Sequence, residues 1–322
     1  MRLARWVGKS ASLSKNLVGA ITKDSEGELQ MAEQNINVDY IRKHVSMLAD
    51  SIGERNISHS RELHRAADYI TDQWRAMGYE VQPQHFMAMG IECSNLEVTR
   101  AGDKHPDRII LLGAHYDSSS GSPGANDNAS GIAALLEVSR TLRQMQLKCS
   151  LRFVAFANQA PPFFGTEEMG SWVYAHHARQ RGDDIRAAVI LETLGYYSDA
   201  PASQLAPAPL SLVCPSRGNF VAMVSNLRSM GVSRRFTRAF RHHSSFPCQQ
   251  VSAPQIVPGI AASDQSPFWL NGYKAFVITD TARYRYPFHH SAKDTPDKIN
   301  CDSIGAVSDG IVKALLELDE RC

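Results

Sequence analysis

Histidine and carboxylate side chains stand at four points of the chain where an apolar stretch ends or a turn is expected. His115 and Asp117 close the apolar run "RIILLGAHYD", and Glu192 closes "AAVILE". Asp127 lies in "PGANDNASG", and His290 lies in "PFHHSAKD". Imidazole nitrogen and carboxylate oxygen are ligands that zinc favours, usually four of them at about 2.0–2.2 Å. These residue types predict a zinc site, provided that the fold brings them to one place.

Each of these residues also has an ordinary structural explanation when it is considered alone. A single histidine at a strand end is most often a satisfied polar residue. Asp127 could merely cap the helix that follows it, and Glu192 could be a buried structural acid, although an unpaired carboxylate there would be costly. Asp117 could accept the second ring N–H of His115 and fix its tautomer. It is the joint occurrence of these residues that favours a metal.

Alternating strand and helix patterns are expected to position these side chains. Nearly continuous apolar runs predict buried strands over residues 108–117, 151–158, 185–195 and 274–280, and residues 80–99 also read as strands. Apolar spacing predicts helices over residues 36–53, 61–78, 129–142, 167–181, 220–230 and 304–318. This order indicates an α/β fold with a mostly parallel sheet. Ligands of such sheets bind at the carboxyl ends of the strands, which is where the candidate residues stand.

Composition excludes two classes of partner. The 322 residues carry a formal net charge of +1, so the basic excess typical of nucleic-acid binding is missing. The longest apolar runs, at residues 109–113 and 187–191, are far shorter than the roughly 20 residues of a membrane span. Six cysteines stand far apart without CxxC spacing, which argues against a thiolate zinc site and a disulfide framework but leaves one or two bridges open.

The first thirty residues differ from the rest of the chain. They begin with basic residues, but Lys9 and Lys15 interrupt the apolar stretch of about 7–15 residues that a signal peptide needs. We expect residues 1–30 to be a flexible tail, with a short amphipathic helix over residues 13–21 as the alternative. The remaining residues, 31–322, are expected to form one α/β domain of a cytoplasmic protein.

Several motifs in order resemble a known family. The segments "GAHYDS", "PGANDNASGIAALLEVSR", "LRFVAFAN", "ILETLGYYSDAPASQ", "SDQSPFW" and "HHSAKDTPDKI" are similar to the zinc-dependent aminopeptidase and glutaminyl cyclase family, metallopeptidase clan MH, in its bacterial form. The resemblance runs from about residue 35 to the C-terminus. It implies a single domain with a mixed, mostly parallel sheet of about eight strands and helices on both faces. Its aminopeptidases remove N-terminal residues from peptides with two metal ions.

The resemblance also implies roles for individual residues. His115 resembles the first histidine ligand, and Glu192 stands where the family has an acidic ligand of the same metal. Asp127 resembles the aspartate that bridges both metals, and His290 resembles the histidine ligand of the other metal. Asp117 resembles the acid beside the first histidine, which orients that ligand.

The chain departs from the family pattern where two adjacent glutamates are expected. Gln159 and Ala160 stand in their place; an amide has no usable basicity and a methyl group offers no ligand atom. Gln265, in "SDQSPF", stands where a histidine is expected. Glu167 and Glu168 could substitute for the missing pair, but they lie eight and nine residues beyond Gln159, so the strand register disfavours them.

We therefore expect a metal-dependent exopeptidase of the aminopeptidase type, impaired because the base and one metal ligand are replaced. One zinc ion would be firmly bound by His115, Asp127 and Glu192, and a second site would be weakened. The alternative is a non-catalytic peptide- or protein-binding pseudopeptidase, and a weaker alternative is glutaminyl cyclase-like acyl transfer. The expected ligand is a peptide or a small aminoacyl compound, with no nucleic-acid or membrane partner, and the oligomeric state is left open.

Overall fold

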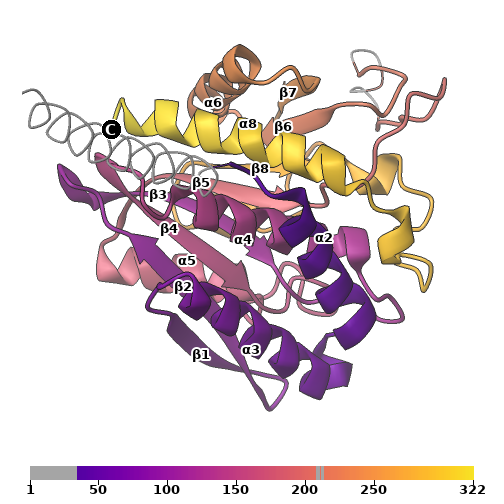
Figure 1. Cartoon of the computed structure of the whole chain (residues 1–322), viewed down its shortest axis with the longest axis horizontal. Coiled ribbons are helices and arrows are strands. Elements are labelled where there is room, and N and C mark those ends of the chain that lie inside the picture. The colour runs from indigo at the N-terminus through magenta and orange to yellow at the C-terminus, as the bar shows by residue number, and fades with distance from the viewer. Residues whose placement is uncertain (1–34, 208–210, 212–213) are drawn as a thin grey trace, which may run out of the picture. The chain divides into compact units, whose positions relative to one another are not determined.

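An eight-stranded mixed sheet organises the chain from Ile36 to Cys322 (Figure 1). The computed structural model describes residues 35–207, 211 and 214–322, so the expected tail and the alternative helix at residues 13–21 lie outside the described residues. The strands are β1 (Gln82–Ala88), β2 (Ile91–Arg100), β3 (His105–His115), β4 (Cys149–Phe156), β5 (Asp184–Glu192), β6 (Val221–Ser225), β7 (Cys248–Ser252) and β8 (Ala275–Thr279).

The order of the strands is β1-β2-β4-β3-β5-β8-β6-β7. The central strands β4, β3, β5 and β8 are parallel neighbours, whereas β1, β2 and β6 introduce antiparallel pairs. The four strands predicted from apolar runs are therefore adjacent in one sheet, and the predicted α/β fold with a mixed, mostly parallel sheet is confirmed. Their carboxyl ends lie at the same edge, which is where the candidate site is found.

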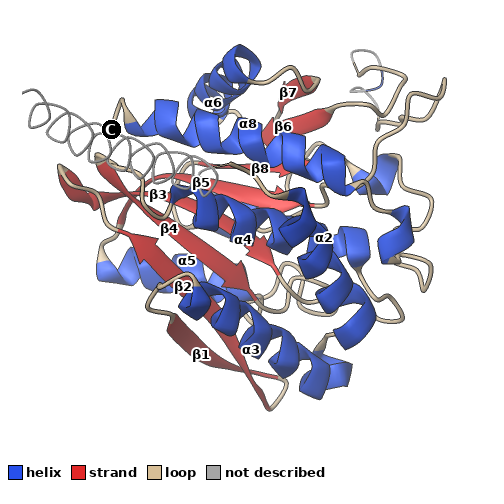
Figure 2. Cartoon of the chain, viewed as in Figure 1, coloured by secondary structure: helices blue, strands red, loops and turns tan. Residues whose placement is uncertain are grey.

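Helices cover both faces of this sheet (Figure 2). They are α2 (Val38–Ser46), α3 (Ser60–Ala76), α4 (Ser130–Leu142), α5 (Gly170–Arg181), α6 (Met230–His243), α7 (Gln265–Leu270) and α8 (Cys301–Asp319). Side chains alternate along β3: Ile110 and Leu112 belong to a hydrophobic cluster that includes residues of α2, α3, α4, α6 and α8, and Ile109 and Leu111 belong to a second cluster that includes residues of α5 and α7. This alternation on a doubly covered strand explains why the sequence of β3 is almost continuously apolar.

The helix predicted over residues 220–230 is wrong. Val221–Ser225 forms β6, and α6 begins only at Met230. The run "FVAMVS" is too short for periodicity to separate a buried strand from a buried helix. β7 was not predicted at all, because only one of its five residues is fully buried and its sequence, "CQQVS", is mostly polar.

A disulfide joins Cys149, the first residue of β4, to Cys322, the last residue of the chain. Asp319 supports the same junction, because its carboxylate accepts hydrogen bonds from the backbone N–H groups of Lys148 and Cys149 at 2.8 and 2.7 Å. The end of α8 is thus fastened to the start of β4. Among the helices in the described ranges, none has the length and apolarity needed to cross a bilayer.

Candidate metal centre

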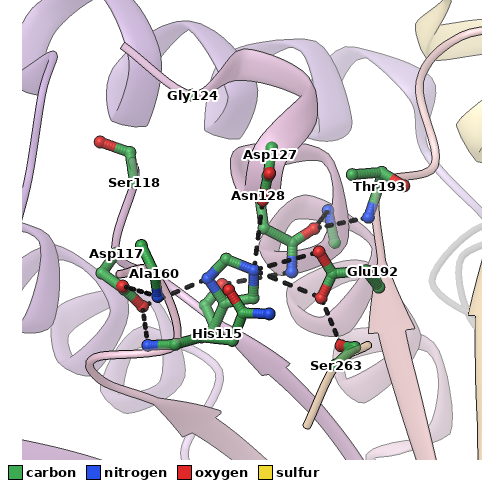
Figure 3. A network of polar contacts seen from close by, with 12 residues as sticks. His115, Asp117, Ser118, Gly124, Asp127, Asn128, Ala160, Glu192, Thr193 and Ser263 are labelled. Atoms are coloured by element: carbon green, nitrogen blue, oxygen red, sulfur yellow. Dashed lines mark hydrogen bonds and ion pairs between the residues drawn. The ribbon is translucent and has the colours of Figure 1, made fainter. Parts of the chain in front are cut away.

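Three side chains converge where β3 and β5 end (Figure 3). Nε2 of His115 lies 3.3 Å from Oδ1 of Asp127 and 3.4 Å from Oε2 of Glu192. The His115 side chain is only 1% exposed, so these carboxylates meet it in an environment with almost no water. Ser263 donates a hydrogen bond of 2.5 Å to the same oxygen, Oε2 of Glu192.

Asp117 joins the end of β3 to the loop after β4. Its carboxylate lies 3.2 Å from Nδ1 of His115 and accepts backbone N–H bonds from Gln159 and Ala160 at 3.0 and 2.8 Å. The hydrogen bond to Nδ1 leaves Nε2 of His115 facing Asp127 and Glu192. Asp117 therefore orients the imidazole, and it also fixes the backbone of Gln159 beside the centre.

The loop that carries Asp127 is held from several directions. Gly124 adopts φ +63°, and a Cβ there would collide with the carbonyl of Asp127, so the turn needs glycine. Asn128 donates to the carbonyl of Leu191 at 2.9 Å and accepts from the N–H of Thr193 at 3.0 Å, which ties the loop to the end of β5. Asp294 accepts from the backbone N–H of Asp127 at 3.2 Å.

Two adjacent histidines approach the other oxygen of Asp127. Nε2 of His290 lies 2.8 Å from Oδ2, and Nδ1 of His289 lies 3.5 Å from the same oxygen. The described part of the chain thus contains two groups that could hold an ion, one of His115, Asp127 and Glu192 and one of Asp127, His289 and His290. Within each group the donor atoms all lie within 4.8 Å of one another.

The electrostatics of the cluster fit a cation. Burial by itself lowers the pKa of His115, but Glu192, Asp117 and Asp127 outweigh this effect and raise the pKa well above its ordinary value. Burial likewise raises the pKa of Asp127, and hydrogen bonds from His115 and His290 outweigh it, so that this pKa falls below its usual range. A carboxylate-rich, buried imidazole site that holds a proton this strongly is also suited to a divalent metal, which takes the proton's place when it binds.

The remaining predicted site residues differ in burial and in whether they line the cavity next to this centre. Gln159 is almost buried and lines the cavity beside Asp127 and Glu192. Glu167 and Glu168 are exposed, belong to neither ligand group and do not line that cavity. Gln265 is fully buried, and its amide donates to the carbonyl of Ile260 at 2.8 Å.

Sequence reasoning missed three residues of the site. They are His289, Asp294 and Ser263, which occur in the sequence only as members of the motifs "HHSAKDTPDKI" and "SDQSPFW". The adjacent pair of histidines was the one visible signal. It was a weak one, because adjacent residues in an extended segment normally point in opposite directions.

The cluster opens into a cavity of about 380 Å³. Beside Asp127, Glu192, His289 and His290, its wall is largely apolar and is built by β6, β7, β8 and the following loops. The apolar lining includes Phe220, Ala222, Val224, Val251, Ile260 and Val277. Such a cavity, with a few polar groups at one end, suits a ligand that has one apolar and one polar part.

The sheet topology and the histidine–carboxylate cluster define the class of the protein as an α/β protein with a candidate metal centre at the carboxyl edge of its sheet. The profile of Peptidase family M28 matches residues 95–315. The uncharacterized protein YfbL of Escherichia coli (strain K12) is 33% identical over 296 residues, which are 89% of this chain and 90% of YfbL. The chain belongs to Peptidase family M28.

Solved structures show the same fold. The zinc aminopeptidase BSAP from Bacillus subtilis superposes with a TM-score of 0.71 at 14% identity, covering 89% of this chain and 96% of BSAP. The glutaminyl cyclase of Fimbriiglobus ruber superposes with a TM-score of 0.67 at 18% identity, covering 87% and 95% of the two chains. The predicted resemblance to zinc aminopeptidases and glutaminyl cyclases is confirmed at the level of family and fold.

Proposed function

We propose that the chain is a zinc-dependent aminopeptidase-type hydrolase that acts slowly on peptides with an apolar first residue. The observation that carries this proposal is the position of the His115–Asp127–Glu192 group at the polar end of an otherwise apolar cavity. A peptide that inserts its first side chain into that cavity would bring its first peptide bond to the histidine–carboxylate end.

The donor set supports one firmly bound ion at this group. His115, Asp127 and Glu192 would supply three ligands to zinc, and catalytic zinc sites with three protein ligands keep a further position for water. Bound zinc would polarise the scissile carbonyl and lower the pKa of its water to about 7. Asp117 orients His115 through Nδ1, and Ser263 holds Glu192, so both ligands are fixed before substrate arrives.

The slow rate follows from the residue at position 159. Gln159 lines the cavity beside the cluster, but its amide cannot accept a proton from water. The two acidic residues of the cavity lining, Asp127 and Glu192, are proposed metal ligands and are therefore not free to act as the base. A positioned base typically contributes about 10²–10⁴ in rate, which sets the expected loss relative to a chain with a glutamate here.

Restoring the acid tests this proposal. Gln159→Glu should raise kcat on an aminoacyl anilide with an apolar residue by at least about tenfold, and Gln159→Glu with Ala160→Glu should do at least as well. Gln180→Glu is the matched control, because this exposed glutamine lies on α5 and is not part of the cavity lining, and it should give no gain. No gain in Gln159→Glu, in a protein that still binds zinc, would refute the role given to position 159.

A second candidate is a non-catalytic protein that binds peptides in the same cavity. The same Gln159 and Ala160 favour it, since both changes fall beside the cluster while the surrounding framework is intact. Tight binding of an apolar peptide, without any turnover in stoichiometric amounts of the native chain, would favour this candidate over the hydrolase.

The disulfide indicates the redox state of the compartment in which the protein is found. The sequence favoured the cytoplasm, but the Cys149–Cys322 bridge is typical of proteins in an oxidising compartment. We propose such a compartment. Mass spectrometry of protein isolated from its native source would test this, and free thiols at both positions would contradict it.

A further inference from the structure

His289 and His290 face the same carboxylate although they are neighbours in the chain. Both imidazole nitrogens approach Oδ2 of Asp127, at 3.5 Å for His289 and 2.8 Å for His290. The rings are stacked, with centroids 3.8 Å apart and planes inclined by 28°. Neither ring is used by the hydrolytic proposal above.

The backbone explains how both rings reach one place. His290 adopts φ +54°, in the left-handed region, which non-glycine residues occupy at a cost. In an extended segment the two side chains would diverge, whereas this turn keeps them on one side. A costly conformation whose result is to aim two imidazoles at one carboxylate points to a function for the pair.

One ring nitrogen of the pair lacks a hydrogen-bond partner within the described residues. Nδ1 of His289 is buried and makes no hydrogen bond within the described residues, although it points toward Asp127. Zinc ligands about 2.1 Å from a tetrahedral centre lie about 3.4 Å from one another. The two distances to Asp127, 2.8 and 3.5 Å, bracket that value. An ion between these three atoms would satisfy the unpaired nitrogen with little rearrangement.

We propose that Asp127, His289 and His290 form a second zinc site, in which His289 supplies the ligand that Ala160 cannot. Oδ1 of Asp127 faces His115 and Oδ2 faces the histidine pair, so Asp127 would bridge two ions. Without His289, only Asp127 and His290 would serve this ion, and the site would be weakened, as the sequence predicts. With His289 the group has three protein ligands.

The second ion binds less tightly than the first. The His115 side chain is 1% exposed, whereas His290 is 45% exposed, and Asp117 and Ser263 support only ligands of the first group. This inference rests on the zinc-dependent function proposed above. Its test measures bound metal rather than turnover, so that the two proposals can fail separately.

The experiment is a titration of metal-free protein with zinc, read by calorimetry and by elemental analysis after gel filtration in buffer of fixed free zinc. The native chain should bind two ions in two steps. His289→Ala should bind one ion and lose the weaker step, with affinity for the second ion reduced more than about 100-fold, beyond the usual effect of an outer partner. His242→Ala, which changes an exposed histidine of another adjacent pair on α6, should still bind two.

Two outcomes would overturn the inference. One is a native chain that saturates with a single ion, which would leave the proposed function standing. The other is His289→Ala that still binds two ions. Because the first outcome needs only the native chain, the inference stays falsifiable even when a variant fails to fold. A native chain that binds no zinc would instead remove the proposed function itself.

Discussion

Replacing Arg55 should destabilise the protein severely, because this buried guanidinium binds backbone carbonyls, including two in the loop that carries Asp127. Arg55 is fully buried and donates to five backbone carbonyls, at Leu48, Gly53, Tyr116, Pro123 and Gly124. The carbonyls of Leu48 and Gly124 also accept from Gly53 and Ala129. The other three have no further hydrogen bond within the described residues, so Arg55→Met would leave three acceptors unsatisfied.

The size of the effect follows from that count. A buried acceptor without a partner costs about 1–3 kcal/mol. The Tyr116 carbonyl is buried, whereas the carbonyls of Gly53 and Pro123 are only partly buried, so the three together should cost about 3 kcal/mol. Burial lowers the pKa of Arg55 to about 10, while Asp117, Asp294 and Asp127 oppose this shift. The arginine therefore stays charged at neutral pH and balances carboxylates near the centre. The total loss would be a large part of the roughly 5–15 kcal/mol that stabilises a typical domain.

Urea unfolding of metal-free protein would measure this loss. Arg100→Met is the matched control, because Arg100 also donates to two backbone carbonyls but is only partly buried; it should cost less than about 1 kcal/mol. Arg55→Lys keeps the charge but loses the guanidinium fork, so it should recover only part of the stability. Equal losses in Arg55→Met and Arg100→Met would refute the reasoning.

Three further expectations concern pH, the disulfide and the cavity. Burial, together with the positive charges of Lys43 and Arg140, lowers the pKa of His44 to about 4. The native state then binds fewer protons than the unfolded chain between about pH 6.5 and 4. The stability of the native chain relative to His44→Gln should therefore be complete above pH 6.5 and fall as the pH drops to about 4; a constant difference in urea melts would contradict this. Reduction of the Cys149–Cys322 bridge, which spans a sequence separation of 173, should lower stability by up to about 5 kcal/mol. Cys322→Ser should match the reduced native chain, and an unchanged melting temperature would argue that the bridge does not form. Ala262→Phe, in the cavity lining, should lower kcat/KM for peptides beginning with phenylalanine at least about tenfold more than for those beginning with alanine. Equal effects on both would count against the cavity as the binding site of the first side chain.

Sequence patterns were sufficient for the central part of the fold. The strands β3, β4, β5 and β8 are covered on both faces, so their apolar runs are long and easily distinguished. β6 and β7 lie at the end of the sheet, where a five-residue run such as "VAMVS" is short enough to fit a helix equally well. Pairing with β8, rather than any local preference, decides that β6 is a strand.

The site was predictable where residue type and strand end coincide, as at His115 and Glu192. It was not predictable where the backbone conformation determines which way a side chain points. The φ of +54° at His290 turns His289 toward Asp127, and no residue type nearby signals that turn. Arg55 was missed for a related reason, because its partners are backbone carbonyls from distant loops and carry no sequence signature.

Release of the N-terminal residue from unmodified peptides by the zinc-loaded native chain, followed by mass spectrometry, tests the central claim most directly. The reaction should be run with the chain in excess over peptide, since turnover is expected to be slow. We predict stepwise loss of the first residue from peptides that begin with leucine or phenylalanine. We predict no cleavage when zinc is removed or when His115 is replaced by alanine. No product in stoichiometric protein with zinc bound, or cleavage only at internal bonds, would contradict the account.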